Sequence, residues 1–381
     1  MDRRPAPLAR TRRRRAYSSL KGTPLATIVL TGGGTAGHVT PNIALIPKLR
    51  DAGYIIHYIG THDGIERDLL ASEKFPYHVI PAGKLRRYLD WQNLTDIFRI
   101  GLGFLKAFFT LGRIKPDVVF SKGGFVTPPV VWAAWLRRIP VIIHESDITP
   151  GLANKLALPF ARHICHAFAE TAEHLPSDNS VHTGIPVRTE LRNGDVQKGR
   201  DMCGFHAEAP IVLFMGGSLG SQTINTTLQT ALPDLLKTFQ ICHLCGRGNL
   251  NESLNQTPGY AQFEYVSDDL SHLLAAADFV VSRAGATTLF ELLTLHKPTL
   301  LIPLSARVSR GDQILNAQSF QISGYSLVLA EEDLTPGTLL QSIQELRARE
   351  TELKNAMKEW SDRDAITDIF HIINNAHKNL S

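Results

Sequence analysis

Two glycine clusters in this 381-residue chain have the composition and setting of loops that bind phosphate groups. The first, GGGTAGH at positions 32–38, follows the apolar run 26–31. The second, GGSLGS at positions 216–221, follows the apolar run 211–215. Glycine lets a ligand approach the backbone closely, and the helix that comes after it offers unpaired N–H groups and a positive dipole end. Two such clusters about half a chain apart predict two similar domains that face one cleft.

The first cluster also has the form G-x-G-x-x-G, which is typical of dinucleotide-binding domains. That fingerprint requires an acidic residue closing the second strand, whereas here the second strand ends in Gly60 and Thr61, and Asp63 comes late. His38, at the mouth of the loop, can act as a base or bind an anionic group. The alternative is that His38 only forms a hydrogen bond to the loop.

Polar residues follow other predicted strands. HESD at 144–147 lacks the second histidine of H-E-x-x-H, so a zinc-protease interpretation fails. SRAGATTLFE at 282–291 combines small residues, which let a ligand approach a helix start, with two threonine hydroxyls. Its Glu291 can accept hydrogen bonds from a ribose diol, or it can simply interact with the helix dipole. The amides of Gln313 and Asn316, less than one helical turn apart, could bind sugar hydroxyls.

The elements that must position these residues alternate between strand and helix. Short continuous apolar runs predict buried parallel strands, at 25–31, 55–59, 77–80, 117–120 and 141–144 in the first half and at 211–215, 239–244, 262–266, 279–282, 299–303 and 327–329 in the second. The pattern predicts two doubly wound α/β domains whose ligands lie at the carboxyl ends of the strands. We expect a disordered basic tail at 1–24, domains at 25–188 and 189–355, and a C-terminal helix within 356–381 that returns toward the first domain.

Composition narrows the classes of function. Hydrophobic residues make up 43% of the chain and charged residues 20%, which is typical of a globular protein, and a net charge of +4 gives no case for nucleic acid. No apolar run approaches the roughly 18 residues that a spanning helix needs. The four cysteines, Cys242 and Cys245 included, are interpreted as core residues of a protein from a reducing cytoplasm.

The predicted helix at 91–111 is apolar on several faces and flanked by basic residues. Such a stripe is most often core. The alternative is a patch for the surface of an anionic membrane, for which the candidates are Trp91, Leu94, Phe98 and Phe108, with Arg86 and Arg87.

Taken together, the motifs resemble the MurG family of peptidoglycan glycosyltransferases. The resemblance runs from about residue 26 to the C-terminus and is carried by segments 32–38, 121–125, 144–147, 184–188, 216–218 and 282–291, and by Gln313 with Asn316. It implies a GT-B architecture of two Rossmann-like domains facing a cleft. It also implies inverting transfer of GlcNAc from UDP-GlcNAc to the 4-hydroxyl of undecaprenyl-diphosphate-linked MurNAc-pentapeptide, with the enzyme peripheral at the cytoplasmic face of the bacterial cell membrane.

The resemblance also implies roles for individual residues. His38 and Glu145 are the candidate bases. Arg188 and Ser218 would contact the diphosphate, and Glu291 the ribose. The remaining expected donor-site residues are Thr35, Ala36, Gly37, Asp147, Val266 (to uracil, through its backbone), Ala286, Thr287, Thr288, Leu289, Phe290 and Gln313. Neither a metal nor a tightly bound cofactor is expected, because Ser218, Arg188 and helix N-termini can meet the charge of the leaving UDP.

Four other functions stay open at this level. A UDP-GlcNAc 2-epimerase has the same two-domain architecture, and a glycolipid-forming transferase differs only in its acceptor. An NAD-dependent enzyme is supported by the first glycine cluster alone. A nucleotide-sugar sensor would bind the donor without turnover.

Overall fold

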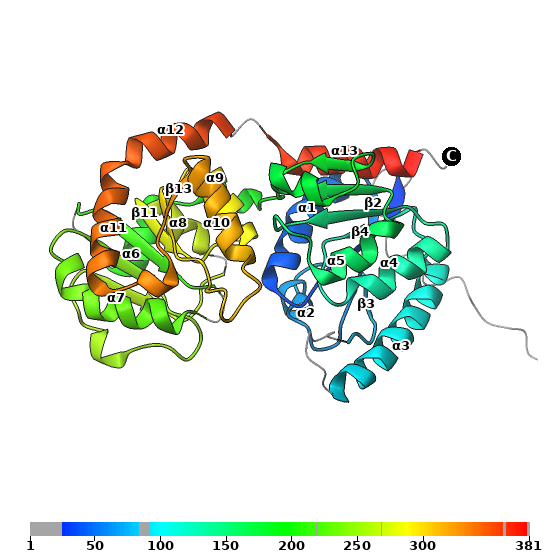
Figure 1. Cartoon of the computed structure of the whole chain (residues 1–381), viewed down its shortest axis with the longest axis horizontal. Coiled ribbons are helices and arrows are strands. Elements are labelled where there is room, and N and C mark those ends of the chain that lie inside the picture. The colour runs from blue at the N-terminus through cyan, green and yellow to red at the C-terminus, as the bar shows by residue number, and fades with distance from the viewer. Residues whose placement is uncertain are drawn as a thin grey trace, which may run out of the picture.

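The computed structural model of the chain describes residues 25–83, 91–206, 208–217, 220–267, 269–360 and 363–378. Two α/β domains lie side by side, each built on a wholly parallel sheet with helices on both faces (Figure 1). The strand orders are β3-β2-β1-β4-β5-β6-β7 and β10-β9-β8-β11-β12-β13. The predicted pair of doubly wound domains is confirmed.

The first sheet has seven strands, of which the last two were not predicted. The strands are β1 (Ala26–Thr31), β2 (Tyr54–Gly60), β3 (Tyr77–Val79), β4 (Val118–Ser121), β5 (Val141–Glu145), β6 (His163–His166) and β7 (Ser180–His182). Alternate residues of β1 enter different cores, Ile28 and Leu30 on one face and Val29 on the other. This two-sided burial explains why the central strands are continuous apolar runs.

Helices of the first domain connect its strands. They are α1 (Thr40–Asp51), α2 (Ile65–Leu69), α3 (Trp91–Ile114), α4 (Thr127–Leu136) and α5 (Leu152–Ala157). The first glycine cluster does not lead directly into a long helix. A short 3-10 turn, η2 (Ala36–His38), separates it from α1, and Pro41 stands in the first turn of α1. This turn carries His38 to the edge of the cleft.

The second domain repeats the pattern with six strands. These are β8 (Ile211–Met215), β9 (Gln240–Leu244), β10 (Tyr260–Phe263), β11 (Phe279–Ser282), β12 (Thr299–Leu301) and β13 (Ser326–Val328). Its helices are α6 (Val196–Cys203), α7 (Gln222–Leu235), α8 (Leu270–Ala276), α9 (Ala286–Thr294), α10 (Asp312–Ile322) and α11 (Pro336–Ala348). The strand expected at 262–266 ends at Phe263, so Val266 lies in the loop beyond it.

The chain crosses back to the first domain at its end. Helix α12 (Glu350–Trp360) covers the second domain, and α13 (Ala365–Lys378) lies on the first (Figure 1). Ile369 and Ile373 of α13 are fully buried in the same core cluster as Leu45 of α1. The last helix therefore ties the two domains together on the side away from α3.

Helix α3 presents an apolar stripe to solvent. Phe98, Leu102, Leu105 and Phe109 are 70%, 59%, 51% and 61% exposed, and their spacing places them on one helix face. Phe108, expected in this patch, is instead half-buried toward the core, where the Arg137 guanidinium lies 3.8 Å from its ring centre. Among the described residues, none of the helices is both long enough and apolar enough to cross a membrane.

Candidate active site

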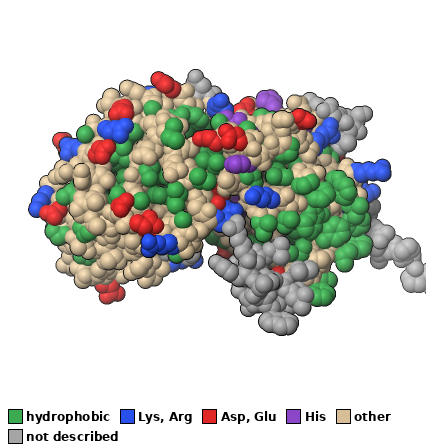
Figure 2. Space-filling view, in the orientation of Figure 1, with side chains coloured by type: hydrophobic (Ala, Val, Ile, Leu, Met, Phe, Trp, Pro, Cys, Tyr) green, Lys and Arg blue, Asp and Glu red, His purple; other side chains and the backbone are tan. Residues whose placement is uncertain are grey.

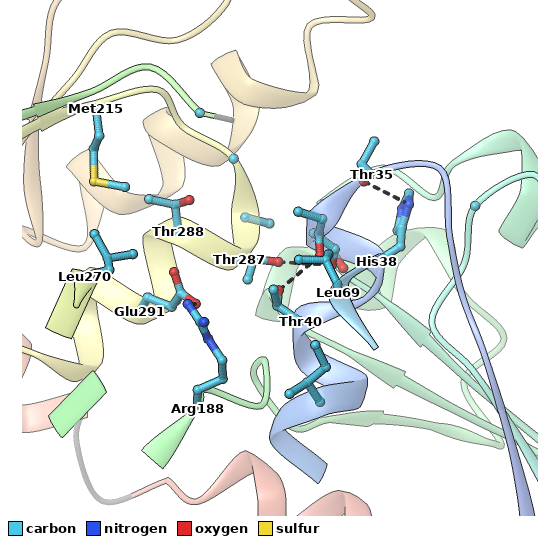
Figure 3. Close-up of a pocket in the computed structure, with 18 of the residues that line it drawn as sticks. Thr35, His38, Thr40, Leu69, Arg188, Met215, Leu270, Thr287, Thr288 and Glu291 are labelled. Carbon is cyan, nitrogen blue, oxygen red and sulfur yellow. Dashed lines mark hydrogen bonds and ion pairs between the residues drawn. The ribbon is translucent and has the colours of Figure 1, made fainter. Parts of the chain in front are cut away.

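A pocket of about 1220 Å³ lies between the two domains. It is formed by loops at the carboxyl ends of both sheets, as expected for doubly wound domains. Figure 3 shows Thr35 and His38 of the first domain on one side and Met215, Leu270, Thr288 and Glu291 of the second on the other. Thirteen of the expected site residues line it: Thr35, Ala36, Gly37, His38, Glu145, Asp147, Arg188, Val266, Ala286, Thr287, Thr288, Glu291 and Gln313.

Some expected residues lie elsewhere. Leu289 and Phe290 are only 1% and 2% exposed, and their side chains belong to the core of the second domain rather than to the pocket. They lie on the inner face of α9, opposite to the face that carries Thr288 and Glu291. Ser218, Arg86 and Arg87 lie outside the described residues, and the side chains of Trp91 and Leu94 are not described.

His38 has the geometry of a neutral base. Its Nδ1 lies 3.1 Å from the carbonyl oxygen of Gly33 and 3.1 Å from the hydroxyl of Thr35. A carbonyl oxygen can only accept, so Nδ1 carries the proton and Nε2 keeps its lone pair. Burial, assisted by the positive charge of Lys122, lowers the pKa of His38 to about 4. The imidazole is therefore uncharged near neutral pH, with Nε2 unprotonated.

Glu145, the other candidate base, is committed to its own loop. Its carboxylate is 3% exposed and accepts hydrogen bonds from the backbone N–H groups of Ser146, Asp147 and Gly151 and from the amide of Asn154. Burial raises the pKa of Glu145. Four donors at 2.8–3.1 Å leave little free capacity for a substrate proton, so the geometry favours His38.

A lysine lies buried next to the loop that follows Glu145. The Lys122 side chain is fully buried, and its Nζ donates a hydrogen bond to the hydroxyl of Ser146. Burial lowers the pKa of Lys122 to about 8, so the side chain remains largely charged at neutral pH. Its positive charge opposes protonation of His38 and His144.

Arg188, at the junction between the two domains, forms an ion pair with Glu291 of α9 that sequence analysis did not foresee. Arg188 Nη2 lies 3.3 Å from Glu291 Oε1, and both side chains point toward one another in Figure 3. Burial raises the pKa of Glu291, and the nearby guanidinium opposes that shift. Arg188 Nε is buried with no hydrogen-bond partner in the described part of the chain. The Nε–H of Arg188 could donate to a phosphate, and the neighbouring carboxylate of Glu291 could accept from a ribose hydroxyl. The pair therefore suits a ligand that carries both groups.

Polar contacts hold the two domains together around the pocket. Thr287 Oγ1 at the start of α9 donates to the carbonyl of Gly37 at 3.2 Å. The fully buried Asn316 donates to Asp147 Oδ1 at 3.0 Å, and its Oδ1 lies 3.4 Å from the amide of Ile148. Asn316, considered above as a sugar ligand, therefore joins the domains. Asp147 lines the pocket and also faces Arg310 at 3.7 Å.

Several lining residues escaped sequence analysis. They are chiefly Thr40, Ile43, Leu69 and Ser72 in the first domain and Met215, Tyr265, Leu270 and Arg310 in the second. Of these residues, only Arg310 had a signal in the sequence. It belongs to a charged run, Arg307, Arg310 and Asp312, that follows the predicted strand at 299–303. Among described residues, no group of three or more His, Cys, Asp or Glu side chains is placed to hold a metal ion.

Comparison with known proteins decides the family. Residues 28–166 match the glycosyltransferase family 28 N-terminal domain, and residues 211–369 match the glycosyltransferase family 28 C-terminal domain. The chain belongs to glycosyltransferase family 28.

Relatives in this family are close. The UDP-N-acetylglucosamine–N-acetylmuramyl-(pentapeptide) pyrophosphoryl-undecaprenol N-acetylglucosamine transferase of Clostridium kluyveri is 55% identical, over 91% of this chain and 98% of its own length. A protein of the same name from Bacillus anthracis, numbered 2, is 52% identical, over 92% and 99%. The resemblance to the MurG family is thus confirmed for nearly the whole described chain.

Solved structures agree on the architecture. MurG of Acinetobacter baumannii superposes with a TM-score of 0.72 at 25% identity, over 92% of this chain and 99% of that one. A UDP-N-acetylglucosamine 2-epimerase gives a TM-score of 0.64 at 15% identity, over 91% and 95%, which shows only that the fold is shared. The family 28 chain has the predicted GT-B architecture.

Proposed function

We propose that this family 28 enzyme transfers GlcNAc from UDP-GlcNAc to the 4-hydroxyl of lipid-linked MurNAc-pentapeptide, with inversion, in peptidoglycan synthesis. The observation that carries the proposal is a pocket that brings the Arg188–Glu291 pair and His38 of the first domain together. The relatives named for this reaction, at 51–55% identity, support the same donor and acceptor.

In this mechanism His38 is the general base. Nε2 takes the proton of the acceptor hydroxyl as its oxygen attacks the anomeric carbon from the face opposite to UDP. The bond from the anomeric carbon to the diphosphate oxygen breaks, and UDP leaves with the electron pair. The hydrogen bond from Nδ1 to Gly33 fixes the tautomer that this step requires.

Protein groups would receive the charge that develops on UDP. Arg188 offers its unpaired Nε–H, and α9 begins at the pocket, where Ala286 and Thr287 of its first turn line the wall. Glu291 would accept from the ribose. We expect transfer to persist in excess chelator, because these groups meet the charge without a metal.

A transfer assay tests the proposal. Radiolabelled UDP-GlcNAc is offered with lipid-linked MurNAc-pentapeptide, with diacylglycerol, or alone. We expect label in the MurNAc lipid only. Label in diacylglycerol would point to a glycolipid-forming enzyme, and UDP-ManNAc formed without acceptor would point to an epimerase; either result contradicts the proposal.

We also propose that the enzyme works as a peripheral protein at an anionic membrane surface, where the lipid-linked acceptor lies. The exposed stripe of α3 supports this, together with Trp135 and Leu136 of α4, which are 53% and 54% exposed. Figure 2 shows hydrophobic side chains gathered over this part of the first domain, with basic side chains beside them. Exposed apolar patches rimmed by Lys and Arg suit the boundary between headgroups and acyl chains.

Vesicle binding tests the membrane surface. We expect Phe98→Asp/Phe109→Asp to abolish co-sedimentation with phosphatidylglycerol vesicles. Ile322→Asp is the matched control, because Ile322 is 87% exposed in the second domain and far from the stripe. Equal binding by all three proteins would contradict the assignment.

A further inference from the structure

A buried carboxylate lies beneath the first glycine cluster, and the mechanism above leaves it unused. Glu66, in the short helix α2, has no exposed surface. Its side chain packs against three glycines, two of which face the carboxyl group. A Cβ atom built on Gly33 would lie 2.7 Å from the carboxyl carbon, and Gly60 and Gly64 face the same side chain. A side chain at position 33 would therefore clash with Glu66.

The charge of Glu66 is met by hydrogen-bond donors instead of by a cation. Oε1 accepts from the amide of Thr61 at 2.9 Å and from the Thr61 hydroxyl at 2.6 Å, and Oε2 accepts from the amide of Gly34 at 3.3 Å. Within the described residues, no Lys, Arg or His forms an ion pair with Glu66. Burying a carboxylate without a cationic partner costs free energy of desolvation, and hydrogen-bond donors offset only part of that cost. A buried acid at this position therefore indicates a role beyond packing.

The contact with Gly34 leads to His38. The N–H of Gly34 and the C=O of Gly33 belong to one planar peptide group and point in opposite directions. Glu66 accepts from that N–H, and His38 Nδ1 binds that C=O at 3.1 Å. A single peptide group thus stands between the carboxylate and the imidazole. A negative acceptor on the N–H side polarises the group and strengthens the carbonyl as an acceptor for Nδ1–H.

We infer that Glu66 is a positioning residue for His38 and acts through the Gly33–Gly34 peptide group. It holds the carbonyl that selects the Nδ1–H tautomer, and so keeps Nε2 free for the proton of the acceptor hydroxyl. Its negative charge also favours the imidazolium that forms during transfer, opposing the positive charge of Lys122. This inference rests on the proposed role of His38 as base.

The main test is a double-mutant cycle with the conservative variant Glu66→Gln. The amide keeps the shape of the side chain, removes its charge and presents an N–H₂ group to donors. We expect kcat to fall roughly 10- to 100-fold while KM for both substrates changes little, because positioning rather than binding is lost. Asp63→Asn is the matched control, since that carboxylate is 90% exposed three residues earlier in the chain and should leave kcat unchanged.

The cycle distinguishes action through His38 from general support of the fold. In a His38→Ala background, Glu66→Gln should cause no further loss. If the two losses instead multiply, Glu66 acts elsewhere and the inference is overturned. Should Glu66→Gln fail to fold, Thr61→Val removes a single donor to Glu66 and takes its place in the same cycle, with a smaller loss that should likewise vanish.

A second measurement does not depend on activity. Nitrogen chemical shifts of labelled histidines report the tautomer of each ring at pH 7, and His38→Ala identifies the His38 signals among the fifteen histidines. We expect Nδ1–H alone in the wild type and a mixture in Glu66→Gln. An unchanged tautomer in the variant would overturn the inference. A wild type that fails to transfer GlcNAc but shows the expected tautomers would instead count against the proposed function.

Discussion

The two glycine clusters look alike in sequence but are used differently. In the first, Glu66 fills the space where a Cβ atom of residue 33 would lie. Gly34, with φ of +88°, faces the ring of Phe125. In the second, Gly217 has the same φ of +88°, but a Cβ atom there would meet no atom of the described residues within 4 Å, and the residue lines the pocket. Gly33 and Gly34 of the first cluster are therefore closed by their own domain, although residues 35–38 line the pocket, whereas Gly217 of the second cluster is open to a ligand.

The helical element after each cluster deepens the contrast. The first cluster leads into the 3-10 turn that holds His38, and the second leads into the 14-residue helix α7, with Ser221 as its N-cap. A long helix that starts at a glycine loop is the arrangement that favours bound phosphate. This difference supports the proposal that the second cluster binds the diphosphate of the donor and that the first positions the base. A shared motif thus predicted the location of both loops but not their division of work.

The largest expected effect tests the first cluster. His38→Ala removes the base, and general-base catalysis contributes typically 10²- to 10⁴-fold, so kcat should fall by about that factor. The affinity for UDP, measured by calorimetry, should stay within about twofold of wild type, because the proposed donor contacts come mainly from the other domain. A variant with near-normal kcat would remove the base assignment, and a loss confined to UDP affinity would give the first cluster the role of anion site.

The next effect tests the second cluster. Gly217→Ala adds a methyl group on the open side of the loop, where the donor diphosphate would lie, and we expect UDP affinity to fall about tenfold, which corresponds to roughly 1.4 kcal/mol. Gly204→Ala is the matched control. Gly204 also has positive φ and open space around it, but it caps α6 and does not line the pocket. Equal affinities in both variants would contradict the assignment.

The sequence predicted most of this arrangement because its strongest signals are local. Apolar runs located the central strands, and the glycine clusters and polar strand ends located the pocket. The strands β6 and β7 escaped because polar residues interrupt their apolar pattern, and three of their seven residues are histidines. Short strands at a sheet edge acquire their identity from pairing, which no local pattern shows.

The details of the site depend on contacts between distant residues. Arg188 and Glu291 are 103 positions apart, and Asp147 and Asn316 are 169 apart, so neither pair has a spacing that sequence analysis could recognise. Glu66 was missed for the same reason. It is one of two acids in a five-residue helix, and only the folded chain brings three glycines around it. The orientation of Phe108 was missed because α3 carries apolar residues on several faces.

A stability measurement sharpens the comparison of the glycines. Gly34→Ala places a Cβ atom 2.8 Å from the Phe125 ring and forces a residue with a side chain to keep positive φ. We expect a loss of roughly 1–3 kcal/mol in the free energy of unfolding. Gly217→Ala carries only the cost of the backbone conformation and should lose about 1 kcal/mol. Denaturant titration of both variants gives the difference in the free energy of unfolding. Equal losses would mean that a Cβ atom at position 34 does not clash with Phe125, which would contradict the closed first loop.

The smallest expected effect concerns the charge beneath the first cluster. Lys122→Met keeps the length of the buried side chain but removes the cation that helps to lower the pKa of His38 to about 4. The pKa of His38 should therefore rise, and the acidic limb of kcat/KM should move to higher pH. Because the folded pKa lies below the unfolded value of about 6.5, wild type loses stability as pH falls from about 6.5 toward 4.

This acid-dependent loss of stability should be smaller in Lys122→Met, since its folded and unfolded pKa values lie closer together. Lys155→Met serves as the control, because Lys155 is an exposed lysine of α5 in the same domain. Rate profiles and unfolding titrations at matched pH values measure both effects. An acidic limb that stays in place would mean that burial alone keeps His38 neutral. The role of Lys122 would then be to stabilise the loop of Ser146 through its hydrogen bond. The first cluster would differ from the second in its packing only.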